Sequence, residues 1–308
     1  MILDLYLPLL QGVLLSLVVV VITALGLLFR SWINAPRGPP QTLADPSVPH
    51  HLRLVDKEVV NKHVKRLRFA LPSPDHILGV PLGQFVELTA DIGQRRTSIS
   101  RFPISSPRTK GYVDFLFKLH EEGEGKEEGE DAARYIASLR DDEVVQVTGP
   151  HGSLTYFGKG KVNLQSDNDE SEDREESFKW LAVIAADTGI DAVLPFIGRV
   201  LGEEHAFHCS LLYINQTEDD ILMRSDLEDL VASHPDHFTL QLHLDKAPDG
   251  WEHGEGEITP DVIRDWLPQP FTETFLLVNM PSGPVRETCL SAVAGTDFPK
   301  ARLHVLPE

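Results

Sequence analysis

The chain has 308 residues and contains few of the residue patterns that bind metals or form disulfide bonds. It has only two cysteines, Cys209 and Cys289, which excludes a disulfide scaffold or a cysteine-rich metal site and suits a reducing compartment. The 13 histidines include no HExxH spacing, so we predict no metal site. The formal net charge of −19 argues against a nucleic-acid partner, because phosphate backbones are bound through positive charge.

Charged residues are also absent between Leu5 and Phe29. About 20 apolar residues span a bilayer, so we predict a transmembrane anchor over residues 1–30. A cleaved signal peptide is the alternative, but it would carry basic residues before its apolar stretch, whereas here Arg30 and Arg37 follow it. Positive charge on that side places the remaining chain in the cytosol, at the endoplasmic reticulum or the mitochondrial outer membrane. Residues 31–50 form a proline-rich linker.

The rest of the chain divides into two halves with different patterns. Residues 51–162 alternate short apolar runs with turns, which predicts an antiparallel β-barrel with one helix near residues 132–139. Residues 163–178 are strongly acidic, and we interpret them as a solvated loop. Residues 179–308 alternate strand and helix patterns, which predicts an α/β domain with a parallel sheet and helices on both faces.

A phosphate-binding geometry is predicted where residues 180–186 meet the following helix. Free backbone N–H groups at a helix start bind phosphate when a strand and a tight turn precede it. Such turns use glycine where the ligand approaches the backbone, but only Gly189 is present here.

Four segments carry a resemblance to a known family: RFALPSPDHILGVPLGQ, GPHGSLTYFGKGK, NQTEDDILMRSDLEDL and LDKAPDGWEHGEGEITPDVIRDWLP. They resemble the NADH–cytochrome b5 reductases, over residues 52–308. The resemblance implies an FAD-binding barrel domain and an NADH-binding parallel-sheet domain. It further implies hydride transfer from NADH to FAD, followed by single-electron transfer to a b5-type haem protein or a cytochrome P450 system.

The cofactor motifs of this family are altered in the chain. The motif Arg-x-Tyr-Thr/Ser-Pro-x-Ser aligns with residues 99–105, where Pro103 and Ser105 agree. Ile99 replaces the arginine that binds the FAD pyrophosphate, and Arg101 replaces the tyrosine that lies against the flavin. A shifted alignment would let Arg95 or Arg101 serve as the phosphate-binding arginine, although no tyrosine is nearby in either case.

The other three motifs change as well. Gly-Gly-x-Met-Ser becomes Gly-Glu-Asp-Ala-Ala at residues 129–133, whose carboxylates oppose phosphate binding or stabilise the helix start. Gly-Gly-Thr-Gly-Ile-Thr-Pro becomes residues 186–192, with Asp187 and Asp191 as new acids; Asp191 alternatively caps the helix. Cys-Gly-Pro-Pro-Pro-Met becomes residues 279–284, which lack the cysteine beside the nicotinamide.

The resemblance nevertheless assigns cofactor contacts to positions that match the family. In this interpretation Lys118 contacts the flavin, and Asp220 either favours NADH or is an ordinary acid at a helix start. The predicted cofactor-binding residues are Pro103, Ser105, Lys118, Thr188, Gly189, Ile190, Asp220 and Pro281. We expect a membrane-anchored oxidoreductase with weakened FAD and NADH binding. The alternative is a non-catalytic relative that keeps the fold as a partner-binding or regulatory membrane module.

Overall fold

The structure is a computed structural model that describes residues 16–17, 20–26, 38–93, 95–119, 130–166, 173–203 and 207–307. It contains two units, residues 1–40 and 41–308. Residues 20–26 of the first unit are helical. Most of the predicted anchor and linker lies outside the described residues, and within the described ranges no helix has the length and hydropathy required to cross a membrane.

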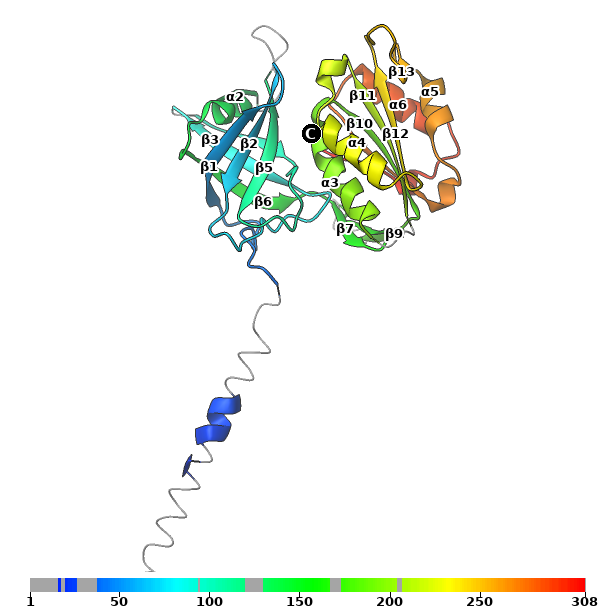
Figure 1. The fold of residues 1–308 in the computed structure, drawn as a ribbon. Helices are drawn as coiled ribbons and strands as arrows, with labels where there is room; N and C mark the ends of the chain where they lie inside the picture. The colour runs from blue at the N-terminus through cyan, green and yellow to red at the C-terminus, as the bar shows by residue number, and fades with distance from the viewer. Residues whose placement is uncertain are drawn as a thin grey trace, which may run out of the picture. The chain divides into compact units, whose positions relative to one another are not determined.

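The second unit begins with a six-stranded antiparallel sheet in the order β4-β3-β6-β1-β2-β5 (Figure 1). Its elements are β1 (His50–Val59), β2 (Val64–Ala70), β3 (Phe85–Ile92), β4 (Arg95–Arg101), β5 (Tyr112–Lys118), α2 (Glu130–Ser138) and β6 (Val144–His151). Strand side chains that alternate inward, such as Leu67 and Phe69, pack around Ile136 of α2. We call this part the antiparallel domain; it corresponds to the predicted barrel, although no pairing between β4 and β5 is found in the described strands.

A small sheet follows, formed by β7 (Leu154–Gly158), β8 (Lys161–Leu164) and β9 (Arg174–Ser177). Part of the acidic segment 163–178 is therefore strand rather than loop, which corrects the sequence-based interpretation. The segment is a strand because its backbone pairs antiparallel with β8, and the Glu176 carboxylate lies 3.4 Å from Arg174 and 3.6 Å from Arg302. Residues 167–172 lie outside the described part of the chain.

The last part, which we call the parallel domain, has the strand order β13-β12-β11-β10-β14-β15 (Figure 1). Its elements are β10 (Trp180–Ala186), η1 (Asp187–Gly189), α3 (Ile190–Leu201), β11 (His208–Asn215), η2 (Glu218–Asp220), α4 (Arg224–Ser233), β12 (Phe238–Leu244), β13 (Gly254–Glu255), α5 (Pro260–Trp266), η3 (Phe271–Glu273), β14 (Thr274–Asn279), α6 (Pro284–Ala294), η4 (Lys300–Arg302) and β15 (Leu303–Val305). Its pairings are parallel. The order reverses between β10 and β14, and ligands bind at such a switch point in open α/β sheets.

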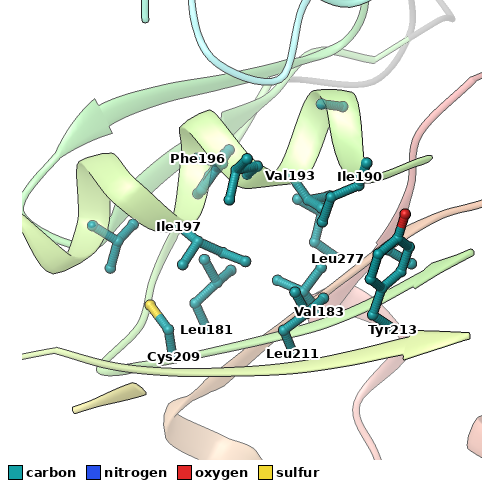
Figure 2. Close-up of a cluster of buried hydrophobic side chains, with 14 of the residues drawn as sticks. Leu181, Val183, Ile190, Val193, Phe196, Ile197, Cys209, Leu211, Tyr213 and Leu277 are labelled. Carbon is teal, nitrogen blue, oxygen red and sulfur yellow. The ribbon is translucent and has the colours of Figure 1, made fainter. Parts of the chain in front are cut away.

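Both faces of β10 are buried, as its continuous apolar run predicts. Leu181 and Val183 face α3, where they join Val193 and Ile197 in one cluster (Figure 2). Ala182 and Ile184 belong to the cluster on the opposite face, which includes Ile263 of α5 and Cys289 of α6. The prediction of helices on both faces is confirmed, and this packing fixes the turn between β10 and α3.

Candidate nucleotide-binding cleft

A cavity of about 760 Å³ lies at the carboxyl ends of the parallel strands. Its walls come from the residues that follow β10, β11, β12 and β14, together with Lys62, His63 and Lys118 of the antiparallel domain. Cavities of roughly 300–1,000 Å³ accommodate small molecules and cofactors. The position, at the switch point of the sheet, is where a doubly wound fold binds nucleotides.

The turn after β10 is held in an unusual backbone conformation. Asp187 has a φ of 55°, a left-handed value that glycine adopts more readily than other residues. Its carbonyl oxygen accepts a hydrogen bond of 2.8 Å from the hydroxyl of Tyr213, whose hydroxyl group also accepts a bond of 3.3 Å from the Leu222 amide. Tyr213 is fully buried beside α3 (Figure 2). The hydroxyl of Tyr213 therefore fixes the backbone of this turn from the buried side.

Gly189 is required by close packing. A Cβ atom at this position would lie 2.1 Å from the carbonyl oxygen of Asn279 at the end of β14. The Asn279 side chain in turn donates a hydrogen bond of 2.8 Å to the Gly189 carbonyl oxygen. The glycine thus brings the turn against the neighbouring strand, which is a structural reason for its presence beside any role in ligand binding.

Asp191 is buried in the first turn of α3 and is only 6% exposed. Burial raises the pKa of its carboxyl group to about 7, while the nearby Arg101 guanidinium and the hydrogen bond from the Ala192 amide oppose this rise. The N-cap residue of α3 is Gly189, so Asp191 does not occupy the capping position. The carboxyl group instead lies inside the protein, opposite an arginine of the antiparallel domain.

Lys118 forms an ion pair with Asp187. The lysine ends β5 of the antiparallel domain, and the aspartate begins η1 of the parallel domain. Both residues line the large cavity, and the side chains of Lys118 and Asp187 are 30% and 27% exposed to solvent. The lysine that the resemblance assigns to the flavin is therefore paired with a carboxylate of the chain itself.

Asp220 and Pro281 also line the large cavity. The Asp220 carboxylate accepts hydrogen bonds from the backbone amide of Thr217 at 3.0 Å and from its hydroxyl at 2.6 Å, and this forms a capping box at η2. Asp220 therefore stabilises a helical turn, as expected for an acid at a helix start, and it also lines the cavity; its preference for NADH stays a prediction.

Pro103 and Ser105 lie elsewhere, beside a cavity of only about 20 Å³. This space is the size of a water molecule and is too small for a flavin ring. Phe102 is 5% exposed and packs edge-on against Phe85, with ring centroids 5.6 Å apart. Ser105 accepts a hydrogen bond of 3.3 Å from the Asp114 amide. The fit to FAD at this segment is poor.

The two candidate arginines for phosphate binding already interact with other groups. The Arg95 guanidinium is 3.7 Å from the Asp131 carboxylate at the start of α2. Arg101 donates a hydrogen bond of 2.8 Å to the Ser100 carbonyl oxygen and lies over the Phe117 ring at 5.4 Å. The neighbouring positions 129 and 130 of the altered phosphate motif have no described side chains.

The large cavity thus brings together Lys118, Asp220 and Pro281. Thr188, Gly189 and Ile190 belong to the adjoining η1–α3 segment, whereas Pro103 and Ser105 line the small cavity. The sequence interpretation missed Asn215 and His243, which are buried and line the large cavity. Asn215 ends an apolar strand. A polar residue at the carboxyl end of a predicted parallel strand is a sequence signal for a cavity-lining position.

Comparisons with known proteins agree with this architecture. Residues 51–156 match the family described as oxidoreductase FAD-binding domain, and residues 183–282 match the family described as oxidoreductase NAD-binding domain. The fold of the cytochrome b5 reductase domain of Ulva prolifera nitrate reductase superposes with a TM-score of 0.77 at 24% identity, over 86% of this chain and 99% of that domain. The fold and the cleft thus define a two-domain oxidoreductase of the FAD- and NAD-binding class.

The relatives narrow this class. Bovine NADH-cytochrome b5 reductase 1 is 40% identical over 278 residues, covering 89% of this chain and 91% of the relative. Chicken (Gallus gallus) NADH-cytochrome b5 reductase 2 is 38% identical over 267 residues, covering 86% and 88%. The chain belongs to the NADH–cytochrome b5 reductase family, and the cofactors of that family's two domains are FAD and NADH.

Proposed function

We propose that the chain transfers electrons from NADH through weakly held FAD to a one-electron acceptor, a b5-type haem protein or a P450-linked protein. The observation that carries this proposal is the cavity of about 760 Å³, because it lies at the switch point of the sheet and includes Lys118 of the antiparallel domain. When bound, FAD supplies the conversion of a two-electron donor into one-electron steps.

The residues of the cleft have separate parts in this proposal. Thr217 and Asp220 form a capping box at the edge of the cavity, where they would hold the ribose of bound NADH. Pro281 would lie on the nicotinamide side of the cavity, and Lys118 would contact the flavin once released from Asp187. Buried Met280 and Ile214 exclude water from the floor of the cavity. Thr188, Gly189 and Ile190 form the turn that adjoins the cavity, where they would contact a bound cofactor.

Weak binding of FAD follows from the charges at the phosphate positions. The Asp131 carboxylate, which is half exposed, lies at the helix start that the resemblance assigns to the FAD pyrophosphate. Two like charges about 4 Å apart repel by about 4 kcal/mol at an effective dielectric of about 20, and exposure reduces this value. Half of it lowers affinity more than tenfold. The Arg95 guanidinium, 3.7 Å from the Asp131 carboxylate, offsets part of this repulsion, so the net effect is smaller than the value for an isolated carboxylate.

We also propose the organisation of the whole chain. Residues 1–30 anchor it in a membrane, because residues 5–29 carry no charge, and residues 31–50 are a linker. The FAD-type domain spans residues 51–162, the acidic segment 163–178 and the NAD-type domain 179–308. The body faces the cytosol at the endoplasmic reticulum or the mitochondrial outer membrane. Its net negative charge favours an acceptor without a strongly acidic surface.

The full chain, purified with added FAD, tests this function. We expect a flavin absorbance band that fades on removal of free FAD, together with NADH-driven ferricyanide reduction that rises with FAD concentration. A folded chain with no flavin band and no ferricyanide reduction at any FAD concentration would refute the enzyme proposal.

A second candidate is the non-catalytic partner-binding module. The ion pair between Lys118 and Asp187 favours it, because the chain's own groups meet at the position where the resemblance places flavin. Thermal unfolding of the full chain distinguishes the two candidates. In the non-catalytic case neither FAD nor NADH raises the melting temperature, whereas the reductase is stabilised by each in proportion to its saturation.

A further inference from the structure

A carboxylate of the parallel domain meets a cationic side chain of the antiparallel domain at the cleft. The ion pair joins Lys118 at the end of β5 to Asp187 at the start of η1, and both line the large cavity. A contact beside it also links the domains, since the Asn61 side chain donates a hydrogen bond of 3.2 Å to the Asp219 carbonyl oxygen. The pair thus lies on a boundary that other contacts hold together.

The aspartate is held in place by the fold. Its left-handed φ of 55° is one that aspartate tolerates better than most residues but that glycine adopts without strain. The buried Tyr213 hydroxyl fixes its carbonyl oxygen at 2.8 Å. The carboxylate is therefore presented to Lys118 from a turn whose backbone is fixed.

A second charged couple lies along the same boundary. Arg101, the last residue of β4, faces the buried carboxyl group of Asp191 closely enough to act on it electrostatically. In the family motifs, glycine and threonine stand at the two aspartate positions and tyrosine stands at the arginine position. All three replacements therefore place ionisable side chains on the two sides of this boundary.

We propose that Asp187 is an internal competitor of FAD: its carboxylate occupies Lys118, joins the two domains in the cofactor-free chain and lowers the affinity for the flavin. This inference rests on the proposed function, which assigns Lys118 to the flavin. Asp187 thereby lowers the affinity for the cofactor, and FAD contacts Lys118 only when the pair opens. A partly exposed ion pair contributes little stability, so a cofactor of adequate affinity displaces it.

The variant Asp187→Asn tests the competition because it keeps the side-chain shape and the tolerance of left-handed φ but removes the charge. The control is Asp249→Asn, which removes one charge from an exposed loop residue that does not line the cavity. Binding is measured on the full chain by quenching of FAD fluorescence. We expect Asp187→Asn to bind FAD about fivefold more tightly than wild type, equivalent to about 1 kcal/mol, because the gain is limited to the free energy of the pair that is removed. The control stays within about twofold of wild type.

Equal FAD affinity in Asp187→Asn and wild type, or binding too weak to detect in both, overturns the inference. If wild type reduces no ferricyanide at any FAD concentration, the proposed function is refuted instead. A gain of FAD affinity in Asp187→Asn would still support the competition in that case. The two failures are therefore distinguishable.

A double-mutant cycle checks the pair without any cofactor. Lys118→Met, Asp187→Asn and the double variant are unfolded in urea as FAD-free full chains. We expect the two residues to be coupled by about twofold to fivefold in the unfolding equilibrium constant. Additive effects of the two substitutions would mean that the pair does not join the domains, and would overturn the inference.

Discussion

Asp191 gives the sharpest prediction for stability, because a buried carboxyl group is sensitive to pH. Burial raises its pKa from the ordinary value of 3.8 to about 7, against the opposing effects of Arg101, the Ala192 amide and Asn279. Asp187 adds to the rise. Since the pKa is higher in the folded state, the folded chain binds the proton more tightly, and stability falls as the pH rises from about 4 through 7.

The size of the effect follows from the two pKa values. Each pKa unit corresponds to about 1.4 kcal/mol, so the charged carboxyl group costs about 1.5–2 kcal/mol at pH 5 and about 4 kcal/mol at pH 8. Asp191→Asn removes this penalty. Its side-chain oxygen can still accept the hydrogen bond that the Ala192 amide donates to Asp191 at 2.6 Å. We therefore expect the variant to be more stable than wild type, by about 2 kcal/mol more at pH 8 than at pH 5.

Urea unfolding of the full chain at pH 5 and pH 8 measures this difference. The exposed-loop variant Asp249→Asn is the control, and its stability relative to wild type should not change between the two pH values. A stabilisation by Asp191→Asn that is equal at both pH values, or a loss of stability at pH 8, would refute the reasoning. Such results would mean that the pairing with Arg101 outweighs desolvation.

Three further predictions concern the turn and the altered motif. Gly189→Ala should lower the free energy of unfolding by about 3 kcal/mol or more, because its Cβ would lie 2.1 Å from the Asn279 carbonyl oxygen. The control Gly198→Ala in α3, where a Cβ has open space, should raise the free energy of unfolding by about 0.5–1 kcal/mol. An unchanged stability of Gly189→Ala would contradict the close packing at this position. Tyr213→Phe should cost about 1–2 kcal/mol in urea unfolding through the lost bond to the Asp187 oxygen, and an unchanged midpoint would show that the turn needs no such anchor. Ile99→Arg combined with Arg101→Tyr should raise FAD affinity more than tenfold in fluorescence titration, whereas no gain would show that the alignment of this segment is wrong.

Much of the fold was predictable because hydrophobic periodicity specifies it. The continuous apolar run at residues 180–186 predicts a strand buried on both faces, and β10 is that strand. The same reasoning missed β4, whose sequence RRTSISR has no apolar alternation and which is a strand because it pairs along β3. It also missed β9, since its sequence REES reads as a solvated segment until the pairing of Glu176 with distant Arg302 is known.

The candidate site was predictable only in part. A local motif is sufficient to identify Gly189 and Asp220, and the structure places both at the cleft or beside it. The partner of Lys118 could not be predicted, because Asp187 is 69 residues away and the two meet only when the domains are packed. Motif comparison identified Asp187 as an acid near a phosphate path, whereas the structure shows it paired with a lysine.

The flavin content of the purified full chain tests whether this reductase binds FAD only weakly. The chain is expressed in cells with ample riboflavin, purified by gel filtration without added FAD, and then titrated with FAD while the flavin absorbance and NADH-driven ferricyanide reduction are recorded. We expect the protein to elute with much less than one FAD per chain, and added FAD to restore both signals. Elution with one tightly held FAD per chain would contradict the weakened site, and no restored signal at saturating FAD would contradict the reductase itself.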